Sequence, residues 1–394
     1  MPVARSEGKR RKIDVRVLVV TIVHHPEDAR IRHRQIRSLL DAGHEVVYVA
    51  PFTECAVALP SDVTTVDVPR AFGRRRSTAI RAARREIRAL SPGVDLVLLH
   101  DPELLLSVWG LRGLPPVVWD VHEDTAAAVT LKPWLPRSAR RLAALAVSLL
   151  EHRAERKHHL LLAESSYLAR FRRAHPVVPN TTWVPGQVPP PGADRVVYLG
   201  HLTRARGAVE MVELGRLLGA TVTLELIGTA DDEVRPLLEE ASRTGDLVWR
   251  GFVPNDIALR QVEGALAGLS LLHDEPNYRH SKPTKVIEYM ARGVPAIATP
   301  TLAAQELLEE HRAGIVVPFD DVTAVADGVK RLHDDPALRI SMGRNGHRAA
   351  VEHYAWPVQA GEFVTHLEKW AAQGRRRPKG SHPRRSRRIR TRRR

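Results

Sequence analysis

Lys285 and Glu288 lie three residues apart in the segment HSKPTKVIEYMARGVPAIAT, which spans residues 280–299. With Thr284 they share one ridge of a predicted helix that begins near Pro283 and precedes an apolar, strand-like stretch. A lysine at a helix N-terminus suits a diphosphate, and a carboxylate one turn later can accept two hydrogen bonds from a ribose diol. A Lys–Glu pair at this spacing is also typical of a surface ion pair, and the segment alone does not decide between the two.

Histidines and carboxylates follow three predicted strands in the first half of the chain. The strands end in HHPEDARIR, HDPELL and DVHED, which place His25, Arg30, His100, Asp101 and His122 at strand ends. Because parallel strands end at one edge of a sheet, these side chains are expected to lie near one another. Histidine and carboxylate can also bind a metal, but no compact H-x-x-x-H spacing is present, and we expect no metal.

The segment GHLTRARG follows the first predicted strand of the second half. Gly200 ends that strand, Arg204 and Arg206 come next, and Gly207 opens a helix. Backbone N–H groups and guanidinium groups could therefore converge on a phosphate there. Solvated arginines on an exposed turn are the alternative.

Apolar runs of strand length alternate with helical patterns on both sides of a proline-rich stretch. Runs that are apolar throughout and separated by helices predict an α/β fold with parallel sheets covered on both faces. No G-x-G-x-x-G or P-loop motif follows a first strand, which argues against a nicotinamide dehydrogenase and a P-loop NTPase. The expected organisation is a basic disordered lead (1–14), an N-terminal Rossmann-like domain (15–178), a linker (179–194), a C-terminal Rossmann-like domain (195–356), a closing helix that could cross back to the first domain (357–372) and a basic disordered tail (373–394).

The net charge of +15 over 394 residues is concentrated at the C-terminus. Residues 375–394 contain eleven arginines and one lysine but no acid. Such a tail could bind an anionic membrane surface or be merely solvated, and specific nucleic-acid binding is not expected because no nucleic-acid module accompanies it. With one cysteine, no membrane-spanning apolar run and no signal peptide, we expect a cytoplasmic protein, peripheral at the inner face of the membrane if the tail binds it.

Together these segments resemble the retaining, nucleotide-sugar-dependent glycosyltransferases of family four. VTIVHHPEDARIRHRQIRSLLDAGHEVVYVAP is similar to a subgroup with an H-P-x-x-D-x-R-I pattern, and HDPELL and WDVHED are similar to its later strand ends. YLGHLTRARG is similar to the family's G-R-L-x-x-x-K-G segment, and SKPTKVIEYMARGVPAIAT to its P-x-K-x-x-E-Y-M-A-x-G-x-P-V-I-A core. The resemblance implies the GT-B fold, in which two facing Rossmann-like domains with parallel sheets enclose a central cleft.

The resemblance also implies roles for individual residues. Arg206 and Lys285 would contact the donor diphosphate, Glu288 the ribose, and His122 would be the catalytic-side residue facing the donor sugar. His280 stands where the family's E-x7-E pattern has its first glutamate. The implied nucleotide-sugar site is Gly200, Arg204, Arg206, Thr284, Lys285 and Glu288, with sugar or acceptor contacts from His25, Arg30, His100, Asp101, Asn277, Tyr278 and His280.

The expected activity is metal-independent, cofactor-free sugar transfer with retention, by a hexosyltransferase-like enzyme of cell-surface polysaccharide or glycolipid synthesis. Its partners would be a nucleotide-sugar donor and a saccharide or lipid-linked acceptor. A sugar-nucleotide epimerase of the same fold and a non-enzymatic protein that binds anionic surfaces through its tail are the alternatives. The amphipathic stretch 137–158 could rest on a bilayer, but packing of its leucines against the first sheet is the interpretation that we favour.

Overall fold

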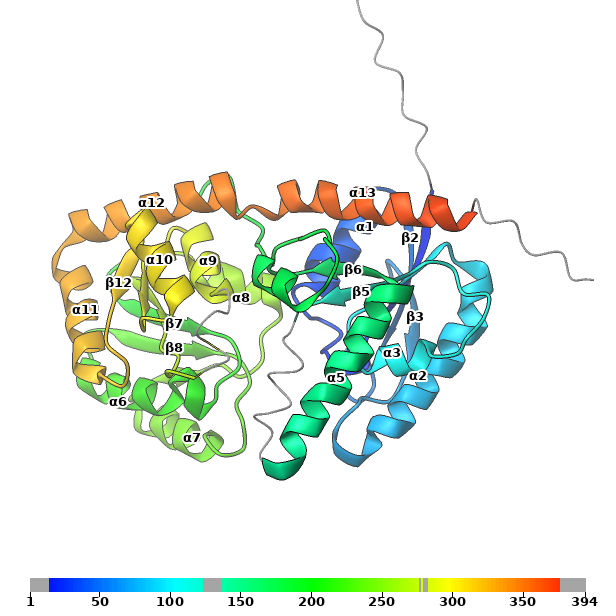
Figure 1. Cartoon of the computed structure of the whole chain (residues 1–394). Coiled ribbons are helices and arrows are strands. Elements are labelled where there is room, and N and C mark those ends of the chain that lie inside the picture. Colours follow the sequence, from blue (N-terminus) through cyan, green and yellow to red (C-terminus); the bar gives the residue numbers. More distant parts are fainter. Residues whose placement is uncertain (1–13, 123–136, 276–277, 279–282, 376–394) are drawn as a thin grey trace, which may run out of the picture.

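The computed structural model describes residues 14–122, 137–275, 278 and 283–375. Among these residues, twelve parallel strands form two six-stranded sheets, one on each side of the proline-rich linker (Figure 1). The α/β class and the two parallel sheets predicted from the sequence are confirmed. No helix in the described part of the chain is long and apolar enough to cross a membrane.

The N-terminal sheet has the strand order β3-β2-β1-β4-β5-β6. Its central strands are buried on both faces, as their uninterrupted Val and Leu content predicts. Its strands are β1 (Arg16–Val20), β2 (Glu45–Ala50), β3 (Thr64–Asp67), β4 (Leu96–Leu99), β5 (Val117–Val121) and β6 (His159–Leu162). Its helices are η1 (Ile31–Ile36), α1 (Arg37–Asp41), η2 (Gly73–Arg75), α2 (Arg76–Leu90), η3 (Ser91–Gly93), α3 (Leu104–Val108), α5 (Arg137–Lys157) and η4 (Ser165–Arg170).

The C-terminal sheet repeats this arrangement with the order β12-β11-β10-β7-β8-β9. In both sheets the strand order reverses beside the first strand, which is where ligands bind in open parallel sheets. The strands are β7 (Arg195–Leu199), β8 (Thr223–Ile227), β9 (Val248–Trp249), β10 (Ala267–Ser270), β11 (Ala296–Ala298) and β12 (Gly314–Val316). The helices are η5 (Arg204–Arg206), α6 (Ala208–Leu218), α7 (Arg235–Thr244), α8 (Asn255–Val262), α9 (Thr284–Ala291), α10 (Leu302–His311), α11 (Val322–Asp334), α12 (Pro336–His353) and α13 (Trp356–Arg375).

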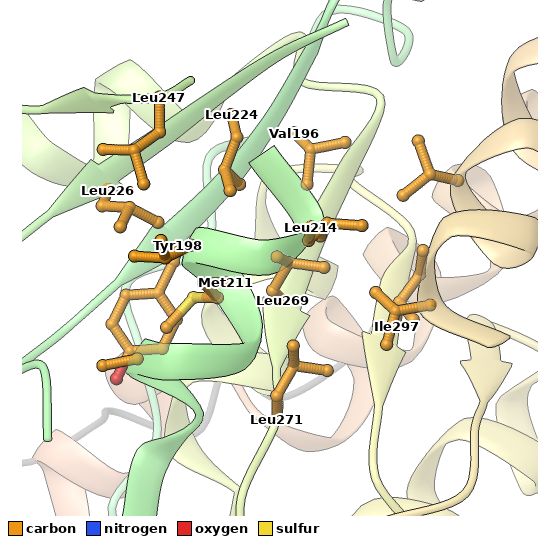
Figure 2. Close-up of a cluster of buried hydrophobic side chains, with 14 of the residues drawn as sticks. Val196, Tyr198, Met211, Leu214, Leu224, Leu226, Leu247, Leu269, Leu271 and Ile297 are labelled. Carbon is orange, nitrogen blue, oxygen red and sulfur yellow. The ribbon is translucent and has the colours of Figure 1, made fainter. Parts of the chain in front are cut away.

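A hydrophobic core fills the space between the C-terminal sheet and α6. Met211 and Leu214 of α6 meet Leu224, Leu226 and Leu269 of the strands, all of them fully or almost fully buried (Figure 2). Tyr198 of β7 belongs to the same cluster, but its hydroxyl group donates a hydrogen bond to the carbonyl oxygen of His201 (2.9 Å). This packing fixes the end of β7, from which the candidate site is built.

Helix α13 returns to the N-terminal domain, the crossing that the sequence left open (Figure 1). Trp356 is fully buried and its indole N–H donates to Ser38 Oγ (2.8 Å), while Phe363 and Trp370 join the core of the first sheet. Arg375 ends the helix and pairs with Asp95 (2.7 Å). The helix therefore extends three residues past its expected end at 372, and 373–375 do not belong to a disordered tail.

Two local predictions differ from the structure. Strand β3 was not predicted, because its sequence TTVD is short and only partly buried at the sheet edge. Residues 29–42, between the first two strands, have a helical pattern that predicts an ordinary α-helix, but the segment begins as a π-helix, η1, before it continues as α1. π-Helical turns are rare and occur frequently at functional sites, and this one carries Arg34, which proves to be a site residue.

Candidate functional site

Lys285 lies in the first turn of α9; the residue is partly exposed, but its Nζ is buried and has no hydrogen-bond partner among the described residues. The ammonium group lies 3.9 Å from the centroid of the Tyr198 ring. Burial, and then the positive charge of Arg206, hold the pKa of Lys285 well below its usual value. A buried ammonium group that lies over an aromatic face and has no hydrogen-bond partner among the described residues is expected to bind an anion.

Gly200 lies directly against this lysine. Its φ angle of +135° favours glycine, and a Cβ atom at this position would lie 3.7 Å from Lys285 Nζ. Gly228, at the end of the neighbouring strand, has a φ angle of +146°, and a Cβ there would lie 1.9 Å from the Gly200 carbonyl oxygen. The two glycines thus keep the ends of β7 and β8 close together, and Gly200 places no side chain of its own beside Lys285.

Arg206 adds a second cation to this region. Its guanidinium group donates to the carbonyl oxygen of His201 (3.4 Å). Although burial opposes it, Tyr198 and Tyr278 raise the pKa of Arg206, so the group keeps its charge. Arg204 behaves differently: it is exposed and pairs with Glu233 (2.8 Å) on the surface. The structure therefore brings Arg206, but not Arg204, together with Lys285.

Glu288 lies one turn after Lys285 and forms an ion pair with the N-terminal domain. Its Oε1 lies 3.1 Å from Nη2 of Arg34, and both side chains are more than nine-tenths buried. Burial raises the pKa of Glu288, and Arg34 opposes this shift. Sequence reasoning missed Arg34, since nothing near it in the chain signals a partner 254 residues away. The candidate site thus includes side chains from both domains.

Asp120, at the end of β5, is the centre of a buried network in the N-terminal domain. Both of its oxygens accept hydrogen bonds from Arg30 at 2.7 Å, and one of them also accepts from Gln35 (2.9 Å). Although burial alone would raise it, Arg30 holds the pKa of Asp120 well below its usual value. His100 lies 3.3 Å from the same carboxylate and is fully buried, and burial lowers its pKa. Arg30 and His100 were predicted to contact sugar or acceptor, but they lie beneath the surface and support the site from within.

His122 connects this network to His24. Their Nε2 atoms are 2.8 Å apart, so only one of the two can carry the proton at that position. His122 Nδ1 lies 3.1 Å from the carbonyl oxygen of Asp120, which it can reach only as a donor, and its Nε2 is then an acceptor. His24 is the donor in this arrangement, and its Nε2 also lies 3.4 Å from Asp101.

Asp101 is fully buried and holds the turn that carries His24. It accepts hydrogen bonds from Thr21 Oγ1 (3.1 Å) and from the backbone N–H of Val23 (3.2 Å), so it is a support for the site and not a surface contact. The sequence pointed to His25 because it begins the HPEDARI pattern. His25 instead packs against Phe252 of the C-terminal domain, with ring centroids 4.8 Å apart. The histidine that pairs with His122 is His24, the residue before His25, and sequence reasoning missed it.

Other predicted residues have less defined places. Tyr278 interacts electrostatically with Arg206, and Thr284 is the first residue of α9. Asn277 and His280 lie outside the described residues.

His100, Asp120 and His122 place ligand atoms within 4.8 Å of one another, a spacing that a metal ion could bridge. The guanidinium group of Arg30 already occupies both oxygens of Asp120, which disfavours a cation at this position.

Two facing Rossmann-like domains with a shared site define the GT-B class. Sucrose-phosphate synthase from Thermosynechococcus elongatus has the same architecture, with a TM-score of 0.71 and 17% sequence identity over 92% of this chain and 100% of that chain. Anabaena HepE in complex with UDP-glucose is also similar, with a TM-score of 0.65 and 13% identity over 90% of this chain and 100% of that chain. These similarities establish the GT-B fold, as the sequence predicted.

Residues 193–335 match the family model described as Glycosyl transferases group 1. The match covers most of the C-terminal domain, including Lys285 and Glu288. Phosphatidyl-myo-inositol mannosyltransferase of Mycobacterium leprae (strain TN) is 26% identical over 303 residues, which cover 71% of this chain and 75% of that protein. Alignments with other curated relatives cover about 40% of the relative's length.

Proposed function

We propose that this protein transfers a sugar from a nucleoside diphosphate donor to an acceptor hydroxyl group. The observation that carries the proposal is the buried ammonium group of Lys285, which has no hydrogen-bond partner among the described residues. It lies at the N-terminus of α9 beside Gly200 and Arg206, where a diphosphate would supply the missing partner. HepE, which shares the architecture, was solved with UDP-glucose, in support of a nucleotide-sugar donor.

Glu288 is the proposed ribose contact. Its carboxylate lies one helical turn from Lys285, which matches the order of ribose and diphosphate along a nucleotide. Oε1 is engaged by Arg34, so a ribose diol would bind Oε2 or displace the guanidinium group. Nucleotide binding would then change a contact between the two domains.

The proposed mechanism is electrostatic. When the bond between the anomeric carbon and the phosphate oxygen breaks, negative charge develops on the diphosphate, and Lys285, Arg206 and the N-terminus of α9 stabilise it. The departing phosphate accepts the proton of the attacking hydroxyl group on the same face of the sugar, which gives retention. These cationic groups take the role that Mg²⁺ has in other phosphate sites, so we propose that neither metal nor cofactor is needed.

His122 is the proposed residue on the sugar side. Its Nδ1 is held by the carbonyl oxygen of Asp120 and its Nε2 by His24, so both nitrogens have defined roles before substrate binds. The proposed acceptor is a saccharide or a lipid-linked acceptor in cell-surface polysaccharide or glycolipid synthesis at the cytoplasmic side of the membrane. The name of the phosphatidyl-myo-inositol mannosyltransferase relative supports this acceptor class.

Calorimetry with UDP, GDP and ADP, followed by incubation with the matching sugar nucleotides, tests the proposal. We expect one nucleoside diphosphate to bind and to raise the melting temperature, since a ligand that binds only the folded state stabilises it. The anomeric configuration of the product, read by NMR, tests retention, and unchanged turnover in EDTA tests metal independence. Absence of nucleotide binding would refute the proposal, and an epimerised product from donor alone would favour an epimerase.

A further inference from the structure

Helix α5 (Arg137–Lys157) presents an apolar face that no other part of the described chain covers. Leu142, Leu145 and Leu149 are 70%, 57% and 64% exposed, and their spacing of three and four residues puts them on one face of the helix. Of the leucines at 142–150, Leu150 packs against the core. The prediction that the leucines of this helix pack against the first sheet is therefore wrong for Leu142, Leu145 and Leu149.

The opposite side of α5 holds the helix to the domain. Ala154 is buried, and Glu155 accepts hydrogen bonds from the backbone N–H groups of Arg172 (2.7 Å) and Arg173 (2.8 Å). Figure 1 shows α5 running along the outside of the N-terminal domain. The leucine face is therefore not needed to attach the helix, and three exposed leucines in a row are unusual on a surface that stays in water.

Arg153 and Arg156 continue the leucine face toward the end of the helix, where a basic cavity opens. The cavity has a volume of about 680 Å³ and no acidic residue among those that line it. The cations in its wall are Arg112, Arg153, Arg156, Lys157 and Arg173. Burial lowers the pKa of His158, another lining residue, to about 4, and the charges of Lys157, His159 and Arg153 act in the same direction.

Trp109 also lines the cavity. It is half exposed, and the guanidinium group of Arg153 lies 4.2 Å from the centroid of its ring. Tryptophan and arginine with neighbouring leucines are the composition of surfaces that rest in a membrane interface. The cavity thus has charged and apolar groups side by side. A surface of this kind can contact both the phosphates and the acyl chains of a bilayer.

The cavity lies at the opposite edge of the N-terminal sheet from the candidate site. The cavity is lined by Pro116 and His159, at the amino ends of β5 and β6, whereas His122 follows the carboxyl end of β5. Gln373 and Gly374 of α13 also line it, and after Arg375 the sequence continues with ten arginines and one lysine but no acid. The last described residues of the chain therefore lie beside the cavity, and the sequence that follows them is strongly basic.

We propose that this face docks the protein on a membrane that contains anionic phospholipids. The cations of the cavity bind headgroup phosphates, and Leu142, Leu145 and Leu149 enter the boundary of the acyl chains. Either contribution alone is weak, but charge attraction and apolar burial together give stable binding to a bilayer. The tail increases the attraction without defining where the bilayer lies on the molecule.

Sedimentation of the full chain with vesicles of phosphatidylglycerol and phosphatidylcholine tests the proposal. Two variants address the two contributions: L142Q/L145Q/L149Q removes the apolar face, and R153E/R156E reverses charge at the cavity. Matched controls replace exposed residues of the C-terminal domain, L217Q/L302Q for the leucines and R243E/R260E for the charges. Thermal melts of all variants show whether each is folded.

We expect the parent chain and both controls to bind anionic vesicles and to leave vesicles of pure phosphatidylcholine unbound. Each of the two test variants should bind anionic vesicles about tenfold or more weakly, since one basic residue near the surface contributes roughly fivefold and burial of a leucine side chain contributes at least as much. If either test variant binds as the parent does, the contribution that it removes plays no part in docking and the proposal is overturned. Stabilisation by inorganic phosphate without vesicle binding would overturn it too, because the cavity would then be a site for free anions.

Discussion

Replacing Lys285 by methionine is expected to stabilise the fold and, at the same time, to weaken nucleoside diphosphate binding. The ammonium group is buried beside the Tyr198 ring and Gly200 and has no hydrogen-bond partner among the described residues. Replacing a buried ion pair by apolar groups of similar volume is often neutral or stabilises by about 1–4 kcal/mol, and we expect a gain in the stabilising range for this unpaired charge. At about 2–4 °C per kcal/mol for a domain of this size, the melting temperature should rise by several degrees.

The effect on binding has the opposite sign. Removing one partner of a buried, hydrogen-bonded charge pair costs about 2–5 kcal/mol, so Kd should increase roughly 30- to 4,000-fold. Titration calorimetry measures this loss, and a thermal melt without ligand measures the gain in stability. Lys330→Met is the matched control, because Lys330 is exposed and pairs with Asp334 on the surface of α11, and we expect it to change neither quantity by much.

The pH dependence follows from the lowered pKa of Lys285. A bound diphosphate favours the ammonium form of Lys285 and so raises its pKa. Between the pKa of Lys285 in the free protein and its pKa in the complex, binding takes up a proton, and the affinity for the diphosphate therefore falls as the pH rises through this range. In the unfolded chain Lys285 has its ordinary pKa of 10.5, so the unfolded state binds this proton more tightly than the folded state. The parent protein therefore gains stability as the pH rises toward 10.5, and the stabilising effect of Lys285→Met becomes smaller. A variant that melts lower than the parent and binds the nucleotide equally well would refute the reasoning.

Three further predictions concern the rest of the site. Glu288→Ala should weaken nucleoside diphosphate binding about tenfold or more but leave pyrophosphate binding, which needs no ribose contact, unchanged in calorimetry. Arg34→Met should lower the free energy of unfolding by about 3–5 kcal/mol because it leaves Glu288 buried without its partner. The double variant R34M/E288M should recover part of this loss. If denaturant unfolding gives the parent and R34M equal stability, the ion pair does not contribute as expected. His24→Asn and His122→Asn should each slow sugar transfer about tenfold or more, and the double variant should be no slower than the worse single variant. His25→Asn is the control. Additive losses in kcat for the double variant, or an equal loss in the control, would show that His24 and His122 do not act as a unit.

Much of the fold was predictable because local patterns carry it. Continuous apolar runs such as RVLVV and EVVYVA, separated by helical patterns, can satisfy burial on both faces only in a parallel sheet, and both became central strands. The prediction failed where the local signal is weak or ambiguous. Strand β3 is too short and too exposed to stand out, and nothing local distinguishes the π-helical turn at Ile31–Ile36 from an α-helix.

The sequence also determined where chemistry could occur. It placed Lys285 and Glu288 on one ridge of a helix after a strand, and Gly200 and Arg206 after another, because spacing along a helix and position at a strand end are local properties. It could not choose between a surface ion pair of Lys285 with Glu288 and a binding site. The structure excludes the surface pair, since the Nζ of Lys285 and the side chain of Glu288 are buried and Glu288 pairs with Arg34 of the other domain.

Only the tertiary structure decided which neighbours the site residues have. His24 and not His25 meets His122, Arg204 pairs away from Lys285 on the surface, and the leucines of α5 face outward. These outcomes depend on how a loop turns after its strand and on contacts between residues 98 to 254 positions apart, as for His24–His122 and Arg34–Glu288. Residue types and short spacings limit what a segment can do, but the packing of two domains determines which charge lies beside which, and that packing is a property of the whole chain.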